Sequence, residues 1–290
     1  MAKKSEKMTK MQRRENCWGW FLISPMILKV LIFTVFPTVF CLVISFTDYN
    51  MLAARDKITK ATLDNYIEVF TSRDFWRAMW NTVYLMLGIP IRLIIGFLLA
   101  YALNYKFLRG RTVFRVIYYL PAVSSAVAIA LVWKWFFNTD GVFNALFGTD
   151  FAWLIDPDIV KNSLIIKGVW GGVGGTMLMY LAGMQNISED IYEQAALDGA
   201  SPLIKMFKIT LPLLAPITMY LVLTGITGGL NAFADNYTMV SSSASNTAVF
   251  WIYNQFTGGN YPLVGAASFV LMMFVIVFSI PQYKKMIRDN

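Results

Sequence analysis

The chain has 290 residues, of which 57% are hydrophobic and only 14% are charged. This composition is too apolar for a typical soluble domain and indicates a membrane protein. The chain contains no histidine and two cysteines, Cys17 and Cys41, which excludes a disulfide framework, a zinc site and serine–histidine chemistry.

Six segments are long and apolar enough to cross a bilayer, which requires about 20 predominantly apolar residues. They are residues 18–45, 76–103, 113–137, 164–184, 213–233 and 263–282. We therefore expect an all-α polytopic membrane protein with six transmembrane helices and one transmembrane domain, residues 18–284. Residues 1–17 and 285–290 are expected to be terminal tails. The first segment is too long for a cleavable signal peptide, and no small-residue cleavage site follows it.

Basic residues gather on one side of this six-span topology, which accounts for the net charge of +8 without a nucleic-acid partner. They occur in the N-terminal tail, after the second span and at the C-terminus: Lys3, Lys4, Lys7, Lys10, Arg13, Arg14, Lys106, Arg109, Arg111, Arg115, Lys284, Lys285 and Arg288. Cytoplasmic loops are enriched in Lys and Arg. Both termini are therefore predicted in the cytoplasm, and residues 234–262, which lack Lys and Arg, on the outside.

Four basic residues lie within the predicted spans: Lys29, Arg92, Lys134 and Lys167. Burying a charge in a membrane is costly, so such residues are functional candidates. Lys134 and Lys167 lie near span ends, and we expect them to extend to the interface. Arg92 lies deeper and follows Pro90, and a hydrated internal position is left open for it. Asp235, at an outer span end, is the nearest acidic residue.

The absence of intramembrane carboxylates argues against an ion-coupled carrier, which usually holds Asp, Glu or His within the membrane. It also argues against an aspartic protease. The chain has no G-x-x-x-x-G-K-[ST] loop for nucleotide phosphates. If ATP drives transport, another chain must hydrolyse it.

The polar loop between the fourth and fifth spans, residues 186–212, has the pattern of two short helices. Ser188 is suited to cap the first helix, and Gly199 to supply the left-handed residue at its end. Ser201, with proline next, is suited to begin the second helix. Pro212 is expected to end it.

The first of these helices has a small apolar face, as expected from the three- and four-residue spacing of its members. This face comprises Ile191, Tyr192, Ala195 and Ala196. Such a face can pack into a groove on a partner, with Glu193 and Asp198 available for charge pairing at its edge. An ordinary solvated hairpin is the alternative.

The loop resembles the EAA motif of permease subunits in binding-protein-dependent ABC importers. The matching residues are Glu193, Ala195, Ala196, Asp198, Gly199, Ile209, Leu211 and Pro212. Gln194 stands where the family often has its first alanine. Residues 45–50, 81–85, 120–144 and 209–216 further resemble the carbohydrate-type permeases, in particular the first permease of maltose and glycerol-phosphate systems.

The resemblance implies a type I ABC importer permease fold, with a cytoplasmic coupling helix between spans 4 and 5, in a bacterial plasma membrane. It also implies a second, related permease subunit, an ATPase dimer that holds ATP and Mg²⁺, and an extracytoplasmic solute-binding protein. This chain would bind no cofactor or metal and carry no catalytic residue. The residues expected to couple it to the ATPase are Glu193, Ala195, Ala196, Asp198, Gly199 and Pro202.

A carbohydrate site should combine aromatic faces with amide or carboxylate side chains. Residues 228–237 have this mixture, and the resemblance places substrate contacts there. We expect Asn231 first, followed by Asp235, Asn236 and Trp170. Membrane anchoring by Trp170 and solvent exposure of Asp235 are the structural alternatives.

Three other functions remain open: a self-contained carrier or channel, a membrane-embedded enzyme, and import of another cargo such as glycerol phosphate. An anionic cargo would favour Arg92 or Lys167 in the path. The glycines at 171, 172, 174 and 175 favour close helix packing. A role for these glycines in gating is the alternative.

Overall fold

The computed structural model describes residues 10–49, 61–105, 109–240 and 242–288, and only the backbone of residues 12, 13 and 281–288. Within these residues the regular structure is helical, apart from one isolated bridge between Thr47 and Ala61. The first helix begins at Lys10 and the last ends at Arg288, so both predicted tails are helical where they are described. The predicted basic residues Lys3, Lys4, Lys7 and Lys106 lie outside the described residues.

The helices follow one another with short connections. The α-helices are α1 Lys10–Val30, α2 Phe36–Ser45, α3 Asp64–Thr71, α4 Arg73–Leu85, α5 Gly88–Asn104, α6 Arg111–Val123, α7 Ala126–Phe136, α8 Val142–Phe147, α9 Val160–Gln185, α10 Glu189–Leu197, α11 Pro202–Ile204, α12 Leu211–Leu213, α13 Ala215–Leu230, α14 Ala234–Met239, α15 Ala248–Thr257 and α16 Tyr261–Arg288. Two segments are π-helical, η1 Leu31–Val35 and η2 Lys205–Thr210. One is a 3₁₀-helix, η3 Ser243–Ser245.

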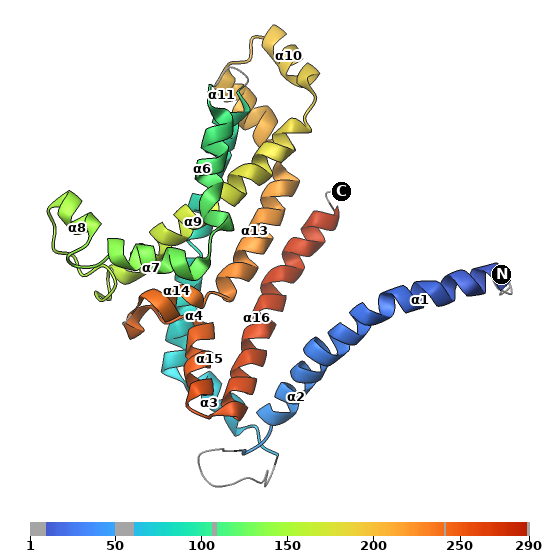
Figure 1. Cartoon of the computed structure of the whole chain (residues 1–290), viewed down its shortest axis with the longest axis vertical. Helices are drawn as coiled ribbons and strands as arrows, with labels where there is room; N and C mark the ends of the chain where they lie inside the picture. The colour runs from blue at the N-terminus through green and yellow to red at the C-terminus, as the bar shows by residue number, and fades with distance from the viewer. Residues whose placement is uncertain (1–9, 50–60, 106–108, 241, 289–290) are drawn as a thin grey trace.

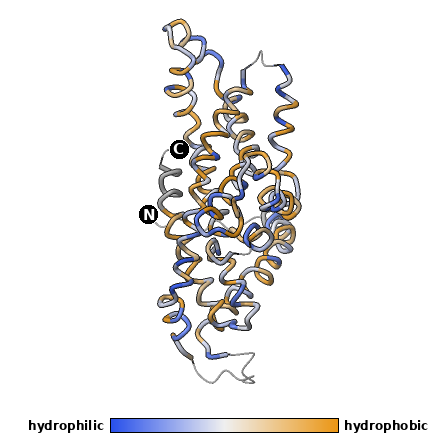
Figure 2. Tube along the Cα trace, turned by 90° about the vertical axis from the view of Figure 1, so that its left-hand side faces the viewer, coloured by the Kyte–Doolittle hydropathy of each residue, from blue (hydrophilic) through white to orange (hydrophobic). Residues whose placement is uncertain are grey.

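Four helical segments in the described chain have the length and composition to cross a membrane without a sharp bend: residues 14–45, 73–104, 160–185 and 261–280. Two bent pairs bring the total to six if each is one span. Hydrophobic residues dominate the long helices, whereas hydrophilic residues are frequent at the two ends of the molecule (Figure 2). The predicted all-α, multi-span fold is confirmed.

The third predicted span, residues 113–137, is not one straight helix. Its two halves, α6 and α7, meet at 100°. Ser124 between them is extended, with φ −86° and ψ 158°, and Ser125 caps α7. Pro121 near the end of α6 removes a backbone donor, which favours termination of the helix there.

The N-terminal helix diverges from the other helices (Figure 1). In residues 14–45, none of the most apolar window is buried. Its second part, α2, packs on α16, where a Cβ at Gly265 would lie 2.8 Å from Cys41 O. Lys29 is exposed on α1, away from the packed helices.

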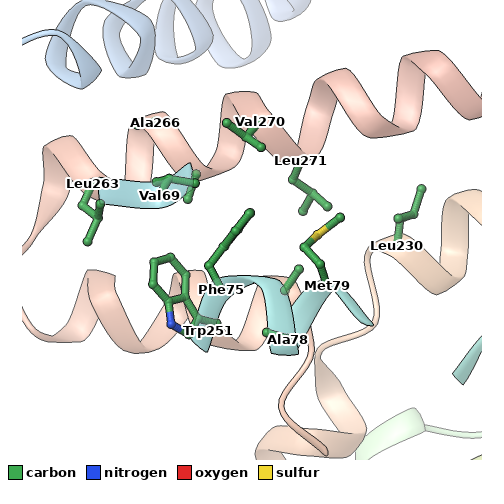
Figure 3. Close-up of a cluster of buried hydrophobic side chains, with 12 residues drawn as sticks. Val69, Phe75, Ala78, Met79, Leu230, Trp251, Leu263, Ala266, Val270 and Leu271 are labelled. Atoms are coloured by element: carbon green, nitrogen blue, oxygen red, sulfur yellow. The ribbon is translucent and has the colours of Figure 1, made fainter. Parts of the chain in front are cut away.

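One buried cluster joins α3, α4, α15 and α16 at the end of the molecule opposite α10 (Figures 1 and 3). Phe75 of α4 and Trp251 of α15 meet edge to face, with ring centroids 5.2 Å apart. Ala266 and Ala267 of α16 are fully buried beside them. Small residues allow helices to approach closely in membranes, and aromatic rings fill the remaining space.

A second cluster joins α5, α9 and α13 and extends toward α10. Close approach depends on glycines. A Cβ at Gly96 of α5 would lie 2.6 Å from Cγ2 of Thr176, and one at Gly174 of α9 would collide with the backbone of α6 at Tyr118. The packing interpretation of the α9 glycines is therefore confirmed for Gly174. At Gly171 and Gly175 no atom lies within 4 Å of the added Cβ.

Candidate functional site

The helix α10 stands at one end of the molecule, joined to the rest by two short connections (Figure 1). Ser188 is its N-cap residue, as predicted, but its side chain makes no capping hydrogen bond. Glu189 and Asp190 occupy the first turn, where the helix dipole favours negative charge. These two negative charges are therefore expected to stabilise the start of the helix.

The C-terminal end of α10 is closed by a Schellman motif. Gly199 has φ +76°, its N–H donates to Ala196 O at 3.1 Å, and the N–H of Ala200 donates to Ala195 O at 2.8 Å. A left-handed residue at this position favours glycine, because a Cβ would be strained. The predicted conformation of Gly199 is confirmed.

The second helix of the loop begins as predicted and ends later than predicted. Ser201 accepts a hydrogen bond from the N–H of Ile204, and Pro202 is the first helical residue. The prediction that Pro212 ends this helix is wrong, because the break falls at Leu214, followed by a 65° bend into α13. The π-helical turns of η2 precede Pro212 and widen the helix, which helps to accommodate a proline ring that would clash in a regular α-helix.

One tyrosine hydroxyl connects the two helical parts of this loop, and another connects the loop to α5. The hydroxyl of Tyr192 lies 2.9 Å from Oγ1 of Thr210 in η2. The hydroxyl of Tyr101 in α5 donates to Pro202 O at 3.1 Å. Oγ1 of the fully buried Thr210 already donates to Lys205 O, so Tyr192 is the donor in their hydrogen bond.

The predicted docking face of α10 is divided by these contacts. Tyr192 turns toward the protein, and Ala195 is half-buried. The exposed residues between Ile191 and Gly199 are Ile191, Glu193, Gln194, Ala196, Leu197, Asp198 and Gly199. The side chain of Leu197 is 88% exposed, although the sequence pattern did not single it out. Leu197 lies beside the exposed Ala196 and Asp198 on this part of the helix.

A cavity of about 240 Å³ lies among α4, α5, α9, α13 and α14. Its polar lining includes Arg92, Thr224, Asp235 and Asn236, and much of the remainder is glycine, as at Gly225 and Gly228. Glycine and alanine leave room at helix crossings, so the cavity is the space left where these helices meet.

Arg92 extends from α5 into the crossing of α9 and α13. A Cβ at Gly172 would lie 2.9 Å from its Nη1, and one at Gly225 would lie 2.9 Å from its Nη2. The guanidinium therefore occupies a slot that only glycine leaves open on both sides. Arg92 lies 12 residues before the end of the segment 73–104 (104 − 92), near the middle of a membrane-spanning length.

Lys167 of α9 forms an ion pair with Asp235, and the distance from Nζ to Oδ1 is 2.5 Å. Lys167 is buried, with 8% relative exposure. The prediction that it extends to the membrane interface is therefore wrong, since a partner on α14 holds it inside the protein. Lys134 is exposed, and its Nζ lies 3.3 Å from Thr238 O.

The four residues expected along the substrate path do not lie together. Asp235 and Asn236 line the cavity. Asn231 is exposed and donates to Thr227 O at 2.8 Å, outside the cavity lining. Trp170 lies on another groove and packs edge to face on Trp133, with centroids 5.4 Å apart.

Asn236 is almost completely buried, and its Nδ2 donates to Ser245 O at 2.6 Å. This hydrogen bond connects α14 to η3, so the residue also has a structural role. Among the described residues, no group of three or more Cys, Asp or Glu side chains could hold a metal ion.

Helices of membrane-spanning length, a glycine-rich internal cavity and a capped helix projecting from one end together define a polytopic membrane protein with the parts of a transporter. A family model described as "Binding-protein-dependent transport system inner membrane component" matches residues 92–285. The chain belongs to this family of transport components, which are permeases and not enzymes.

Several known proteins are similar to this chain over most of its length and most of their own. The chain is 33% identical to "Probable ABC transporter permease protein YesP" of Bacillus subtilis, over 91% of this chain and 88% of that protein. It is 30% identical to "Lactose transport system permease protein LacF" of Rhizobium radiobacter, over 91% of this chain and 92% of that protein. It is 28% identical to "Trehalose/maltose transport system permease protein MalF" of Thermococcus litoralis, over 95% of this chain and 96% of that protein.

A solved structure shares the fold. A chain in the crystal structure of "a bacterial ABC transporter involved in the import of the acidic polysaccharide alginate" has a TM-score of 0.82 and 24% identity, and the likeness covers 95% of this chain and 96% of that chain. At this identity the likeness shows the fold alone. The predicted permease fold is confirmed.

Proposed function

We propose that this chain forms the translocation path of an ATP-driven importer for a carbohydrate, and that α10 couples it to a separate ATPase. Family membership supports the transport role. The named cargo of LacF and MalF, lactose in one and trehalose or maltose in the other, supports a carbohydrate.

The observation that carries the coupling role is the construction of α10. It is a short helix with a closed C-terminal cap, an exposed face and a hydrogen bond from Tyr192 to the next helix. Because Pro202 O is also bonded to Tyr101, movement of α10 would be transmitted to α5 and α13. Alternating access requires this kind of rigid connection between an energy source and a two-state membrane domain.

Each predicted coupling residue has a proposed part. Glu193 would pair with a basic group on the ATPase, Asp198 would be a secondary polar contact, and Ala195 and Ala196 would allow close approach. Gly199 ends the helix by adopting a conformation that favours glycine.

Pro202 would begin the following helix and offer its carbonyl to Tyr101. ATP and Mg²⁺ would be bound by the ATPase dimer and by no residue of this chain.

We place α10 and both termini in the cytoplasm of a bacterial cell, with the protein in the inner membrane. The basic residues near the chain ends and at Arg109, Arg111 and Arg115 support this orientation. An extracytoplasmic solute-binding protein would deliver cargo to the opposite end. The exposed apolar helix at residues 14–45 supports a second permease subunit as a further partner, because such a subunit would cover part of it.

Co-purification tests the coupling role. The tagged protein is extracted from its native membrane beside Glu193→Arg and beside the control Asp150→Arg, which reverses an exposed charge near α8, far from α10 (Figure 1). We expect an ATPase with nucleotide-binding motifs to accompany the wild type and the control, and to be reduced at least fivefold with Glu193→Arg. Equal recovery in all three, or no ATPase in any, would contradict the proposal.

A further inference from the structure

The cavity described above has an unbalanced positive charge. Nε of Arg92 is buried and has no hydrogen-bond partner. The salt bridge beside this cavity joins Lys167 and Asp235, and Arg92 is not part of it. The guanidinium therefore has no carboxylate partner among these residues.

The second cation near the cavity is already neutralised. Asp235 is the acidic residue in the cavity lining, and it pairs with Lys167 at 2.5 Å. Subtracting this pair leaves one positive charge, that of Arg92. An arginine near the middle of a membrane protein usually faces a cavity or a partner, because an uncompensated charge there is costly.

The surroundings of Arg92 fit a small anionic group. Gly172 and Gly225 pack directly against the guanidinium, since a Cβ at either position would lie 2.9 Å from one of its terminal nitrogens, and Arg92 lines the cavity from this slot. A guanidinium presents paired N–H donors that match the two oxygens of a carboxylate. The cavity volume of about 240 Å³ is below the range of about 300–1,000 Å³ found for drug-sized ligands, so a small ligand fits it better than a long saccharide.

We propose that this cavity binds the carboxylate of an acidic saccharide, held by Arg92 of α5 in the slot between Gly172 of α9 and Gly225 of α13. The inference rests on the proposed carbohydrate import and narrows its cargo to sugars that carry an acid group. A carboxylate has one negative charge and balances the cavity. A phosphate monoester has a charge of about −1.5 to −2 at pH 7 and would leave an excess.

Binding to the intact importer tests this. The chain is purified with its co-purifying subunits in lipid nanodiscs, and equilibrium dialysis measures radiolabelled D-galacturonate, D-galactose and D-galactose 6-phosphate. The variants are Arg92→Met, which removes the charge, and Arg92→Lys, which keeps the charge without the planar fork. Lys134→Met is the control, because it removes an exposed basic residue outside the cavity lining.

We expect the wild type and Lys134→Met to bind D-galacturonate at least about tenfold more tightly than D-galactose, as a charge-assisted bidentate contact requires. Arg92→Met should lose this preference, and Arg92→Lys should keep part of it. Thermal melting of each complex in the same nanodiscs identifies variants that fail through unfolding. If Arg92→Met unfolds, Arg92→Lys tests the proposal in its place.

Three results would overturn the inference. They are equal binding of galacturonate and galactose by the wild type, an unchanged preference in Arg92→Met, and stronger binding of the phosphate sugar. If galactose binds equally to the wild type and Arg92→Met, carbohydrate import stands and only the acidic cargo is rejected. The ATPase recovery described for Glu193→Arg is independent of all three.

Discussion

Lys167 and Asp235 are 68 residues apart in the sequence, and the Nζ of one lies 2.5 Å from the Oδ1 of the other. The pair joins α9 to α14 at the edge of the cavity. Relative side-chain exposure is 11% for Lys167 and 31% for Asp235, so the lysine is the more deeply buried of the two charges.

Removing either charge should destabilise the protein more than removing both. Asp235→Asn leaves a buried ammonium without its partner, and we expect it to lower the free energy of unfolding by about 2 kcal/mol, less than the 3–5 typical of a fully buried pair. Lys167→Met should cost less, because Asp235 can reach water. A double-mutant cycle by thermal melting in nanodiscs measures the coupling, and a double variant whose loss of stability equals the sum of the two single losses would show that the pair is weak.

Two neighbouring glycines of α9, Gly171 and Gly172, are expected to differ in their tolerance of alanine, because only Gly172 contacts Arg92. Gly172→Ala places a methyl group 2.9 Å from Nη1 of Arg92, so the guanidinium must move. We expect uptake by the reconstituted importer to fall about fivefold or more. Gly171→Ala is the matched control, because no atom lies within 4 Å of the added carbon. Equal uptake by the two alanine variants would show that the position of Arg92 does not matter for transport.

The hydrogen bond between Tyr192 and Thr210 should be needed for coupling and not for ATPase docking. Tyr192→Phe removes the donor to a buried oxygen, which costs about 1 kcal/mol. ATPase recovery should stay within twofold of wild type, while ATP hydrolysis stimulated by the binding protein falls several-fold. Thr210→Val should give the same phenotype. If both variants keep full stimulation, this bond does not transmit the movement of α10.

Asn236 was expected in the substrate path, and its hydrogen bonds predict a different main effect. Its Nδ2 reaches Ser245 O at 2.6 Å from a buried position. Asn236→Ala leaves that carbonyl unsatisfied, and we expect a loss of about 1–3 kcal/mol in the free energy of unfolding. The exposed Asn231→Ala, measured beside it by thermal melting, should change stability by less than about 0.5 kcal/mol. Similar melting of both variants would argue against a structural role for Asn236.

Local patterns predicted the local structure of the loop well. The αL conformation of Gly199 and the start of a helix at Pro202 depend on neighbouring residues, and both occur as predicted. The direction of Tyr192 could not be predicted in the same way, because its partner Thr210 belongs to the next helix.

Contacts between residues far apart in the sequence also limited how much of the site could be predicted. Lys167 lies near a span end, and only the fold brings Asp235 close enough to hold it inside. The bend between α6 and α7 was missed because apolar composition continues through it, even though Pro121 and two serines mark the position. Composition therefore predicts that a segment can cross a membrane, and tertiary contacts decide whether it is straight.

Asn144 organises the segment between α7 and α9 and provides a last prediction. Its Nδ2 donates to Thr139 O at 2.9 Å and to Phe151 O at 2.8 Å. Its Oδ1 accepts from Thr149 at 2.9 Å and from Trp153 Nε1 at 2.8 Å. One buried amide thus connects both ends of this segment through four hydrogen bonds.

Asn144→Asp keeps the acceptor and loses both donors to carbonyl groups, so we expect local loosening and not global unfolding. At about 1 kcal/mol for each hydrogen bond, the loss is about 2 kcal/mol. Hydrogen exchange should rise at least tenfold in residues 139–156, while α9 beyond residue 170 stays protected. Asn138→Asp, at an exposed neighbouring position, is the control. If both variants exchange alike, the side chain of Asn144 does not hold this segment, and the aromatic contacts of Trp133, Phe137 and Phe143 would have to account for its structure.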